Sequence, residues 1–576
     1  MKALFQKSHF KKYFYFLCFF ILCICDQRVG SASGEIQLVC PNIVLMVLSC
    51  IALSHYPLSR FRRRSFRIPA IVFAAGSFLA LFLIWPNTYY HYQLISGVLA
   101  AILYGCVLIQ TVPALCSAKK LPRGNHLGAG LLGLLTVLIL LSRHDRYNGF
   151  LLCLSVLLLY LTDFTALECE WMLRSLGGAV LTAFFVFQGL AFVFRPYDSL
   201  RYLGLYANTN MNALSYQMAY CVFLCVFCIL EGRKGQGIVK WGSFCFACAM
   251  WPFVLLTMCR SAVLGMGAAT FLGLGITLWK RRGRRLVRGL VYIGGLALGS
   301  VLSFPVVYGA VRYLPAVFHH PVWFMDEYSE EKVHSWDPCD SEKYTDWRDV
   351  LQENFGRLFP GVVGAAVPAE PDTEAYYTHW EIQEGVPAVG EAPVLLASAG
   401  TGSLSSGAIS DETDSEAGIS AEEAPAAGYS VAARFTIYRY YFSRLNLLGH
   451  VDSENGLQID RDYYAPHAHN IVLQYAFNYG LPAGIVFLAY LIASGICYLI
   501  ACIRNESDTP FLLGLLLFAS IAGFGMMEII WRYGQLSHML LLLLPRFAWQ
   551  NRGIQSTAPE TAAVRTAGTV RSRMKL

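Results

Sequence analysis

Long apolar runs recur along almost the whole chain and are separated by short polar segments. The clearest of them cover residues 68–85, 94–112, 127–141, 176–194, 262–279 and 511–531. A helix of about 20 apolar residues crosses the hydrocarbon core of a bilayer, so each run predicts a membrane-spanning helix. By this length rule, the pattern predicts an all-α polytopic membrane protein with about fourteen transmembrane helices.

The composition agrees with that class, because 56% of the 576 residues are hydrophobic and only 14% are charged. Soluble domains carry about a quarter charged residues. Most of the 18 cysteines lie inside apolar runs, where they behave as small apolar side chains, so we predict neither a disulfide scaffold nor a cysteine metal site. The first 25 residues are expected to form a retained helix, with a cleaved signal peptide as the alternative.

Lysine and arginine gather in short clusters between the apolar runs. The clusters lie at the start of the chain and at residues 60–67, 119–123, 231–234 and 280–288. Such clusters face the cytoplasm, and an even number of predicted spans separates each cluster from the next. The pattern predicts a multi-pass protein of the cell (cytoplasmic) membrane, with the amino terminus and the basic tail 550–576 both in the cytoplasm.

The same orientation places one long polar block, residues 311–466, on the outer face. Its middle, residues 361–430, is rich in small and acidic residues and predicts a disordered insert, because it has too little apolar surface to form a core. Apolar residues at helical spacing flank the insert. They are Trp347, Val350, Leu351, Phe355 and Leu358 on one side, and Phe435, Tyr438, Tyr441, Phe442 and Leu445 on the other. We expect two helical flanks around a disordered insert, with transmembrane helices in residues 1–200, 201–310 and 467–549.

Three arginines on the predicted outer side stand out: Arg201, Arg260 and Arg434. Isolated outer arginines, such as Arg143 and Arg146, are usually surface residues. Arg260 differs because it lies between two apolar runs with hardly a loop to solvate it, and an arginine at the membrane surface is costly unless it is paired. The planar guanidinium matches phosphate oxygens, so we expect an anion as its partner.

The segment HAHNIVLQYAFNYGLPAG, residues 467–484, joins the outer block to the last helices. Its pattern predicts a short helix over residues 471–479 that a glycine and a proline then end. Irregular backbone at membrane depth usually lines a cavity, so His469 is a candidate proton acceptor. The alternatives are that His469 is a structural hydrogen bonder and that Asn470 is a helix cap.

This segment resembles the signature of the O-antigen ligase and O-antigen polymerase superfamily. In that signature a histidine and an amide residue are followed by nine residues and then a glycine, which corresponds to His469, Asn470 and Gly480 here. The family usually continues Gly-Leu-Pro-Gly, whereas this chain has Gly-Leu-Pro-Ala-Gly.

Three further segments resemble the family in the expected order. RYLGLYANTNMNAL resembles the family's Arg-x-x-Gly segment followed by Asn-x-Asn, through Arg201, Asn208 and Asn210, although proline is more usual at the middle position. LTMCRSAVLGM keeps the family's arginine as Arg260 but replaces the residues on both sides of it. ARFTIYRYYFSRLNLLGH resembles the arginine-led segment that precedes the histidine, and it begins at Arg434.

The resemblance implies a GT-C-like membrane glycosyltransferase that transfers or polymerises a glycan from an undecaprenyl-diphosphate-linked donor. The acceptor would be a hydroxyl of a glycan, lipid or protein at the outer face, with no metal, cofactor or nucleic acid involved. The resemblance implies catalytic roles for His469, Arg260 and Arg434. It implies substrate-binding roles for Arg201, Asn208, Asn210, His467 and Asn470. Reasoning from the residues agrees, because the chain has no nucleotide-binding loop and fixed arginines can stabilise a leaving diphosphate.

Two other functions remain open. A polysaccharide transporter or flippase would need ionisable groups inside the membrane, and the pattern shows only Glu528 there, with Arg532 as its expected partner. A metal-dependent hydrolase would use the polar segment 319–340. That segment contains His319, His320, His334, Asp337 and Asp340, but their spacing matches no known zinc pattern.

Overall fold

The computed structural model describes most of the predicted helices. The described residues are 8–28, 34–87, 91–118, 126–144, 146–194, 201–202, 204, 209–231, 233, 235–280, 285–318, 322–325, 332–335, 347–356, 431–451, 456–460, 463–465, 467–504, 511–528 and 535–550. The predicted disordered insert (361–430) and the basic tail from residue 551 onward lie outside them.

Nearly all described residues form helices. The helices of the bundle are α2 (Ser8–Arg28), α3 (Gly34–Ser54), α4 (Leu58–Phe61), α5 (Arg64–Ile84), α6 (His91–Ala118), α7 (His126–Leu141), α8 (Arg146–Leu161), α9 (Ala166–Phe194), α10 (Thr209–Leu230), α11 (Gly237–Leu256), α12 (Arg260–Lys280), α13 (Arg285–Phe318), α18 (Ile471–Tyr479), α19 (Leu481–Arg504), α20 (Phe511–Gly525) and α21 (Leu536–Gln550). Within the described part of the chain, eight helices are long and apolar enough to cross a membrane, and five shorter helices are also apolar. The prediction of a helical, multi-pass membrane protein is therefore confirmed at this level.

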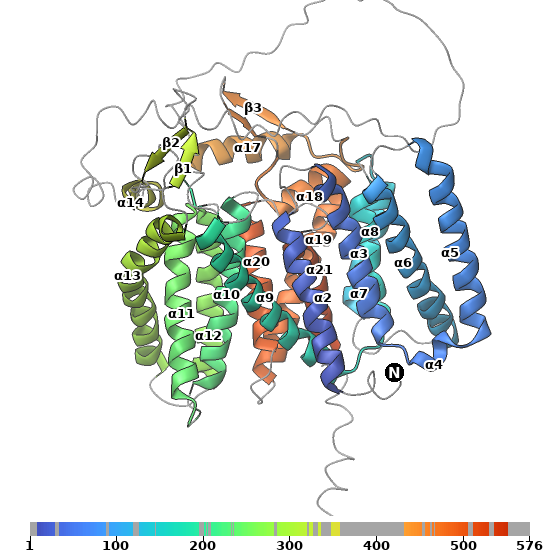
Figure 1. Cartoon of the computed structure of the whole chain (residues 1–576), viewed down its shortest axis with the longest axis horizontal. Coiled ribbons are helices and arrows are strands. Elements are labelled where there is room, and N and C mark those ends of the chain that lie inside the picture. The colour runs from blue at the N-terminus through green and yellow to red at the C-terminus, as the bar shows by residue number, and fades with distance from the viewer. Residues whose placement is uncertain are drawn as a thin grey trace, which may run out of the picture.

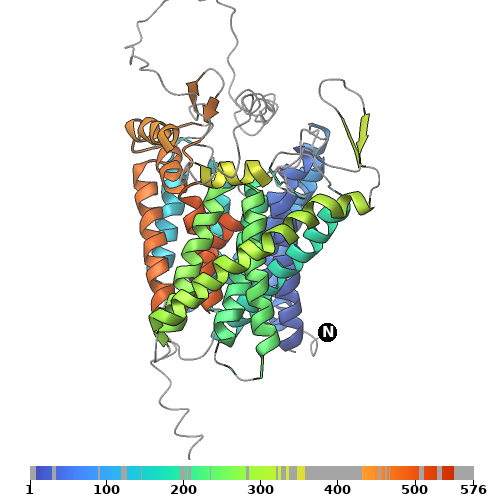
Figure 2. The ribbon, with the colours of Figure 1, turned by 90° about the vertical axis from the view of Figure 1, so that its left-hand side faces the viewer.

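The helices form one bundle with two distinct ends (Figure 1). The short helix α4, which overlaps the start of the basic cluster 60–67, is at one end of the bundle, whereas α17 (Val431–Ser443) and α18 lie at the opposite end. Figure 2 shows that the 34-residue helix α13 crosses the side of the bundle obliquely. The basic cluster and the second helical flank are thus on opposite faces, as the charge pattern predicts.

The centre of the bundle is held by close contacts between α10, α12 and α20. A side chain at Gly265 of α12 would lie 2.6 Å from the carbonyl oxygen of Ser520 on α20, so only glycine allows this approach. The amide of Gln217 on α10 donates to the Ser520 hydroxyl at 2.5 Å. Small residues and interhelical hydrogen bonds drive helix association in membranes, where lipid is as apolar as leucine.

The region predicted to lie on the outer face contains more than two helical flanks. The first flank is formed by α14 (Trp347–Leu351) and the π-helical turn Gln352–Gly356, and the second is α17. Two antiparallel hairpins, which the sequence pattern did not predict, accompany them: β1 (Val322–Met325) with β2 (Lys332–Ser335), and β3 (Leu457–Asp460) with β4 (Tyr463–Ala465). The chain is therefore nearly all helical, with these two short hairpins in addition to the predicted helices.

The predicted apolar face of α17 is only partly correct. Tyr441 is fully buried, and it packs with Ile437 and Phe477. Phe435 and Phe442, however, are 68% and 62% exposed. Ile437 and Tyr441 are four residues apart, so they lie on the same face of α17 and pack against α18. The two phenylalanines therefore lie on the opposite side of the helix.

One predicted span is too long. The apolar run 511–531 predicts a single helix, but α20 ends at Gly525. Glu528 therefore lies beyond the end of the helix rather than inside a span. Its predicted partner, Arg532, lies outside the described residues.

Candidate functional site

The predicted half-helix at the histidine motif is confirmed as α18, which covers Ile471–Tyr479. Asn470 caps it, because its side-chain oxygen accepts hydrogen bonds from the backbone N–H groups of Val472 and Leu473, each at 3.0 Å. The asparagine amide also donates to the Met526 carbonyl at 3.0 Å. Asn470 thus starts α18 and ties it to the segment that follows α20.

The backbone of His469, directly before the cap, is strained. Its φ angle is 46°, and only one other non-glycine residue of the described chain, Met258, has a positive φ. A bulky residue in this region costs about 1–3 kcal/mol, and such strain concentrates at functional sites. Neighbouring contacts hold the conformation: the Tyr438 hydroxyl donates to the His469 carbonyl at 3.3 Å, and Ala468 N–H donates to Gln474 at 2.8 Å.

The helix break after α18 has a steric origin. Gly480 has a φ angle of 95°, and a Cβ there would collide with the carbonyl of Leu447. The adjoining loop is bound to the break by hydrogen bonds from Leu481 N–H to the Asn446 carbonyl at 2.8 Å and from His450 N–H to the Phe477 carbonyl at 3.0 Å. The motif's glycine is therefore needed for close contact between α18 and this outer loop.

The side chain of His469 is paired with Glu528. Its Nδ1 lies 3.3 Å from Glu528 Oε1, and the two side chains are only 12% and 11% exposed. Arg434, from α17, approaches the other carboxylate oxygen at 3.7 Å and donates to the Met527 carbonyl at 2.6 Å. Two predicted site residues, His469 and Arg434, therefore both approach the carboxylate of Glu528.

The ionisation of Glu528 decides which nitrogen of His469 carries the proton. Burial alone raises the pKa of Glu528, but the His469 hydrogen bond and the charges of His469, His467 and Arg434 outweigh burial and hold the pKa below its usual value. An ionised carboxylate only accepts hydrogen bonds, so Nδ1 donates to it. In the neutral imidazole the lone pair is then on Nε2, which is buried and has no hydrogen-bond partner among the described residues.

His467 lies beside this pair. Its ring centroid is 4.3 Å from that of His469, with the planes inclined by 70°. One ligand atom each from His467, His469 and Glu528 lie within 4.8 Å of one another, so the three side chains could hold a metal ion. The sequence predicted no metal site here. It placed the alternative metal site in residues 319–340, of which the structure describes only β1 and β2.

A buried chain of side chains connects the motif to the amino-terminal helices. Gln474, whose side-chain oxygen binds Ala468 N–H, donates to Asn478 at 2.6 Å. The Asn478 amide lies 2.9 Å from His144 Nε2, and His144 Nδ1 lies 3.0 Å from the His450 carbonyl. The helices of residues 1–200, which carry no motif, thus help to fix the histidine segment.

Two further predicted arginines lie near the turn between α11 and α12. Tyr202 N–H donates to the Leu256 carbonyl at 2.9 Å, which ties the Arg201 segment to the end of α11. Arg260 is the first residue of α12. Burial, and to a smaller extent the charge of Glu528, raise the pKa of the neighbouring Cys259 thiol to about 12, and the charge of Arg201 opposes them. Cys259 therefore lies within electrostatic reach of both charges.

The asparagine motif lies at the start of α10. Asn210 is half-buried in the first turn, and Asn208 lies outside the described residues. Asn212, which the sequence analysis did not select, is fully buried and donates to the Tyr202 carbonyl at 2.9 Å. It is packed against Gly204, which has a φ angle of 61°. Asn212 thus holds the loop that carries Arg201.

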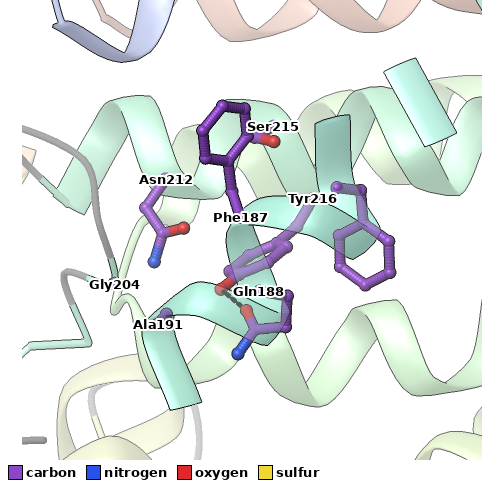
Figure 3. A pocket seen from close by; sticks show the side chains of 8 residues that line it. Phe187, Gln188, Ala191, Gly204, Asn212, Ser215 and Tyr216 are labelled. Carbon is purple, nitrogen blue, oxygen red and sulfur yellow. Dashed lines mark hydrogen bonds between the residues drawn. The ribbon is translucent and has the colours of Figure 1, made fainter. Parts of the chain in front are cut away.

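A small pocket lies beside this loop (Figure 3). It is lined by Phe184, Phe187, Gln188, Ala191, Gly204, Asn212, Ser215 and Tyr216. The Tyr216 hydroxyl donates to Gln188 at 2.5 Å, and the Gln188 amide donates to the Tyr202 hydroxyl at 2.8 Å. Two polar residues of the pocket wall, Tyr216 and Gln188, are thus bound to each other.

The structure brings His467, His469, Asn470 and Arg434 into direct proximity, whereas Arg201 lies on the loop before α10 and Arg260 is the first residue of α12. Sequence reasoning missed the contact of Glu528 with the histidine. Its signal was available, because Glu528 is a lone acid at the end of an apolar run. No family model, curated protein or solved structure matches the chain.

Proposed function

We propose that the chain is a membrane glycosyltransferase of the O-antigen ligase and polymerase type. The observation that carries the proposal is the buried pair of His469 and Glu528, in which the carboxylate orients the imidazole and leaves Nε2 available as a base. The same arrangement, a base held by a carboxylate, serves general-base catalysis in other enzymes. Four segments of the chain resemble motifs of this superfamily and occur in the expected order, which supports the same assignment.

In the proposed reaction, an acceptor hydroxyl attacks the anomeric carbon of a glycan linked to undecaprenyl diphosphate. The new carbon–oxygen bond forms as the bond to the diphosphate breaks, and the hydroxyl proton passes to Nε2 of His469. Glu528 stabilises the resulting imidazolium. The products are the extended glycan, or the glycosylated lipid or protein, and undecaprenyl diphosphate.

Arginines offset the negative charge that develops on the leaving diphosphate. We assign this role to Arg260, at the start of α12, and to Arg201, on the loop before α10. Fixed positive charges of this kind need no rearrangement during the reaction. Arg434 is already engaged by Glu528 and Met527. Its guanidinium has five N–H donors, so it positions Glu528 and can still contact a phosphate oxygen.

The proposal includes the membrane arrangement. We count the eight long and five shorter apolar helices of the described chain, together with α2, as fourteen proposed spans of a GT-C-like bundle. The end that carries α4 and the basic cluster faces the cytoplasm, so the histidine site opens at the outer face of the cell membrane. An enzyme there has no nucleotide supply, which favours a lipid-linked donor.

Buried charges elsewhere in the bundle do not favour a transporter. Arg546 is fully buried, but its guanidinium donates to two carbonyls at the end of α8. Glu168 forms a capping box with Thr165 at the start of α9 and an ion pair with Lys11 at 2.5 Å. These charges, which the sequence analysis did not count, are fixed at helix ends. They do not form a path across the membrane.

The test is a reconstituted transfer assay. Wild-type protein in liposomes should convert a polyprenyl-diphosphate oligosaccharide and an acceptor into polyprenyl diphosphate and a longer glycan, with or without EDTA. Arg260→Lys should lose most of this activity, because an ammonium does not reproduce the planar fork of a guanidinium. Arg143→Lys, an exposed arginine at the same end, is the matched control. Donor that moves across the bilayer without bond cleavage would support the flippase instead.

A further inference from the structure

The two histidines and the acid of the site have the composition of a metal centre. Two imidazoles and one carboxylate form the protein ligands of a common type of zinc site, which leaves a fourth position open. Here one ligand atom each from His467, His469 and Glu528 lie within 4.8 Å of one another. The His-x-His spacing and the inclined rings, 4.3 Å apart, bring both imidazoles to the same acid.

A second observation points to a ligand at this place. Nε2 of His469 is buried and has no hydrogen-bond partner within the described part of the chain. A buried polar atom without a partner is costly, and a metal ion or a substrate hydroxyl would satisfy it. Imidazole nitrogen prefers Zn²⁺, Cu²⁺ or Ni²⁺, whereas Mg²⁺ and Ca²⁺ prefer oxygen ligands.

We propose that His467, His469 and Glu528 bind a divalent transition metal such as Zn²⁺, and that the bound metal stops glycan transfer. The inhibitory part rests on the proposed function, whereas the binding part does not. If the ion binds Nε2 of His469, it occupies the lone pair that would take the acceptor proton. If it binds Nδ1, its charge makes Nε2 a weaker base and displaces the hydrogen bond to Glu528.

The charge balance of the site sets the strength of binding. Two neutral imidazoles and one carboxylate attract a cation, but Arg434 lies 3.7 Å from the other oxygen of Glu528 and repels it. We therefore expect reversible binding, in the micromolar range at neutral pH, rather than a permanent structural ion. The metal acts as an external inhibitor that reaches the site from the outer face.

The binding test uses purified full-length protein in detergent after treatment with EDTA. Titration with Zn²⁺ by calorimetry, and with Co²⁺ by visible absorption, should show one ion per chain that a 100-fold excess of Mg²⁺ does not displace. His467→Ala and Glu528→Gln should each weaken binding at least tenfold, and His126→Ala, an exposed histidine on α7, should not. Two variants are used so that misfolding of one, checked by gel filtration, leaves the other informative. No saturable binding, or equal binding by all four proteins, would overturn the proposal and leave an adventitious ion only.

The activity test separates this inference from the proposed function. In the transfer assay, Zn²⁺ should inhibit wild-type protein at the concentration that fills the site, and EDTA should restore the rate. A protein that transfers glycan but binds no Zn²⁺, or binds it without loss of rate, would overturn the inference alone. A protein that binds Zn²⁺ at these residues but never cleaves the donor would overturn the proposed function and the inhibitory role, and leave only the binding site.

Discussion

Replacing Glu528 by glutamine removes one charge from the site and little else. Glutamine has nearly the same shape, so it can still accept the hydrogen bond from His469 Nδ1 and contact Arg434. It no longer carries the negative charge that stabilises an imidazolium. Glu528→Gln therefore separates the orienting part of the carboxylate from its electrostatic part.

The structure sets the size of the expected effect. The two side chains are 12% and 11% exposed, so water screens the pair only weakly. A hydrogen bond to a charged group contributes about 1.5–3 kcal/mol, and each 1.36 kcal/mol changes the rate about tenfold. Since the imidazolium exists only in the transition state and after it, kcat should fall roughly 10- to 150-fold while KM changes little.

The assay is the initial rate of polyprenyl diphosphate release at several donor concentrations, with folding checked by gel filtration. Glu170→Gln is the matched control, because Glu170 pairs with Arg174 on the surface of α9 and such pairs contribute little. A Glu528→Gln protein with wild-type kcat, or with a change in KM alone, would refute the role given to the carboxylate.

Two further predictions concern the backbone that holds the site. Asn470→Ala should lower the stability by about 0.5–2 kcal/mol through loss of the cap, seen as a lower Tm in detergent, and Asn470→Ser should recover most of it; an unchanged Tm for the alanine variant would contradict the capping role. Gly480→Ala should strongly reduce the yield of folded protein, because its φ is positive and a Cβ meets Leu447. Gly130→Ala on α7, where a Cβ has open space, should be tolerated, and equal yields of the two variants would show that the break needs no glycine.

The fold was predictable where one physical rule acts alone. The lengths of the apolar runs predicted the long helices. The asparagine cap and the glycine that follows the helix predicted both ends of α18 correctly. The two outer hairpins were missed because they are strands of three or four residues in a polar region, where no periodicity builds up. The end of α20 was missed because the residues beyond it are also apolar.

The candidate site was predictable as a set of residues but not as a set of contacts. Periodicity and charge selected His469 and Arg434, yet nothing in the local pattern shows that both meet Glu528, which is 59 residues away from the histidine. The role of His144 was hidden for the same reason, since its partner Asn478 is 334 residues away. Such pairings arise from packing of distant helices, which a single sequence does not show.

The central claim is that His469 takes the proton of the acceptor, and His469→Ala tests it most directly. A general base contributes about 10²–10⁴-fold to the rate, so the variant should lose transfer by at least 100-fold. Binding of the lipid-linked donor, measured separately in detergent, should change less than threefold, and His126→Ala should match wild type in both measurements. Transfer at the wild-type rate by His469→Ala would contradict the account.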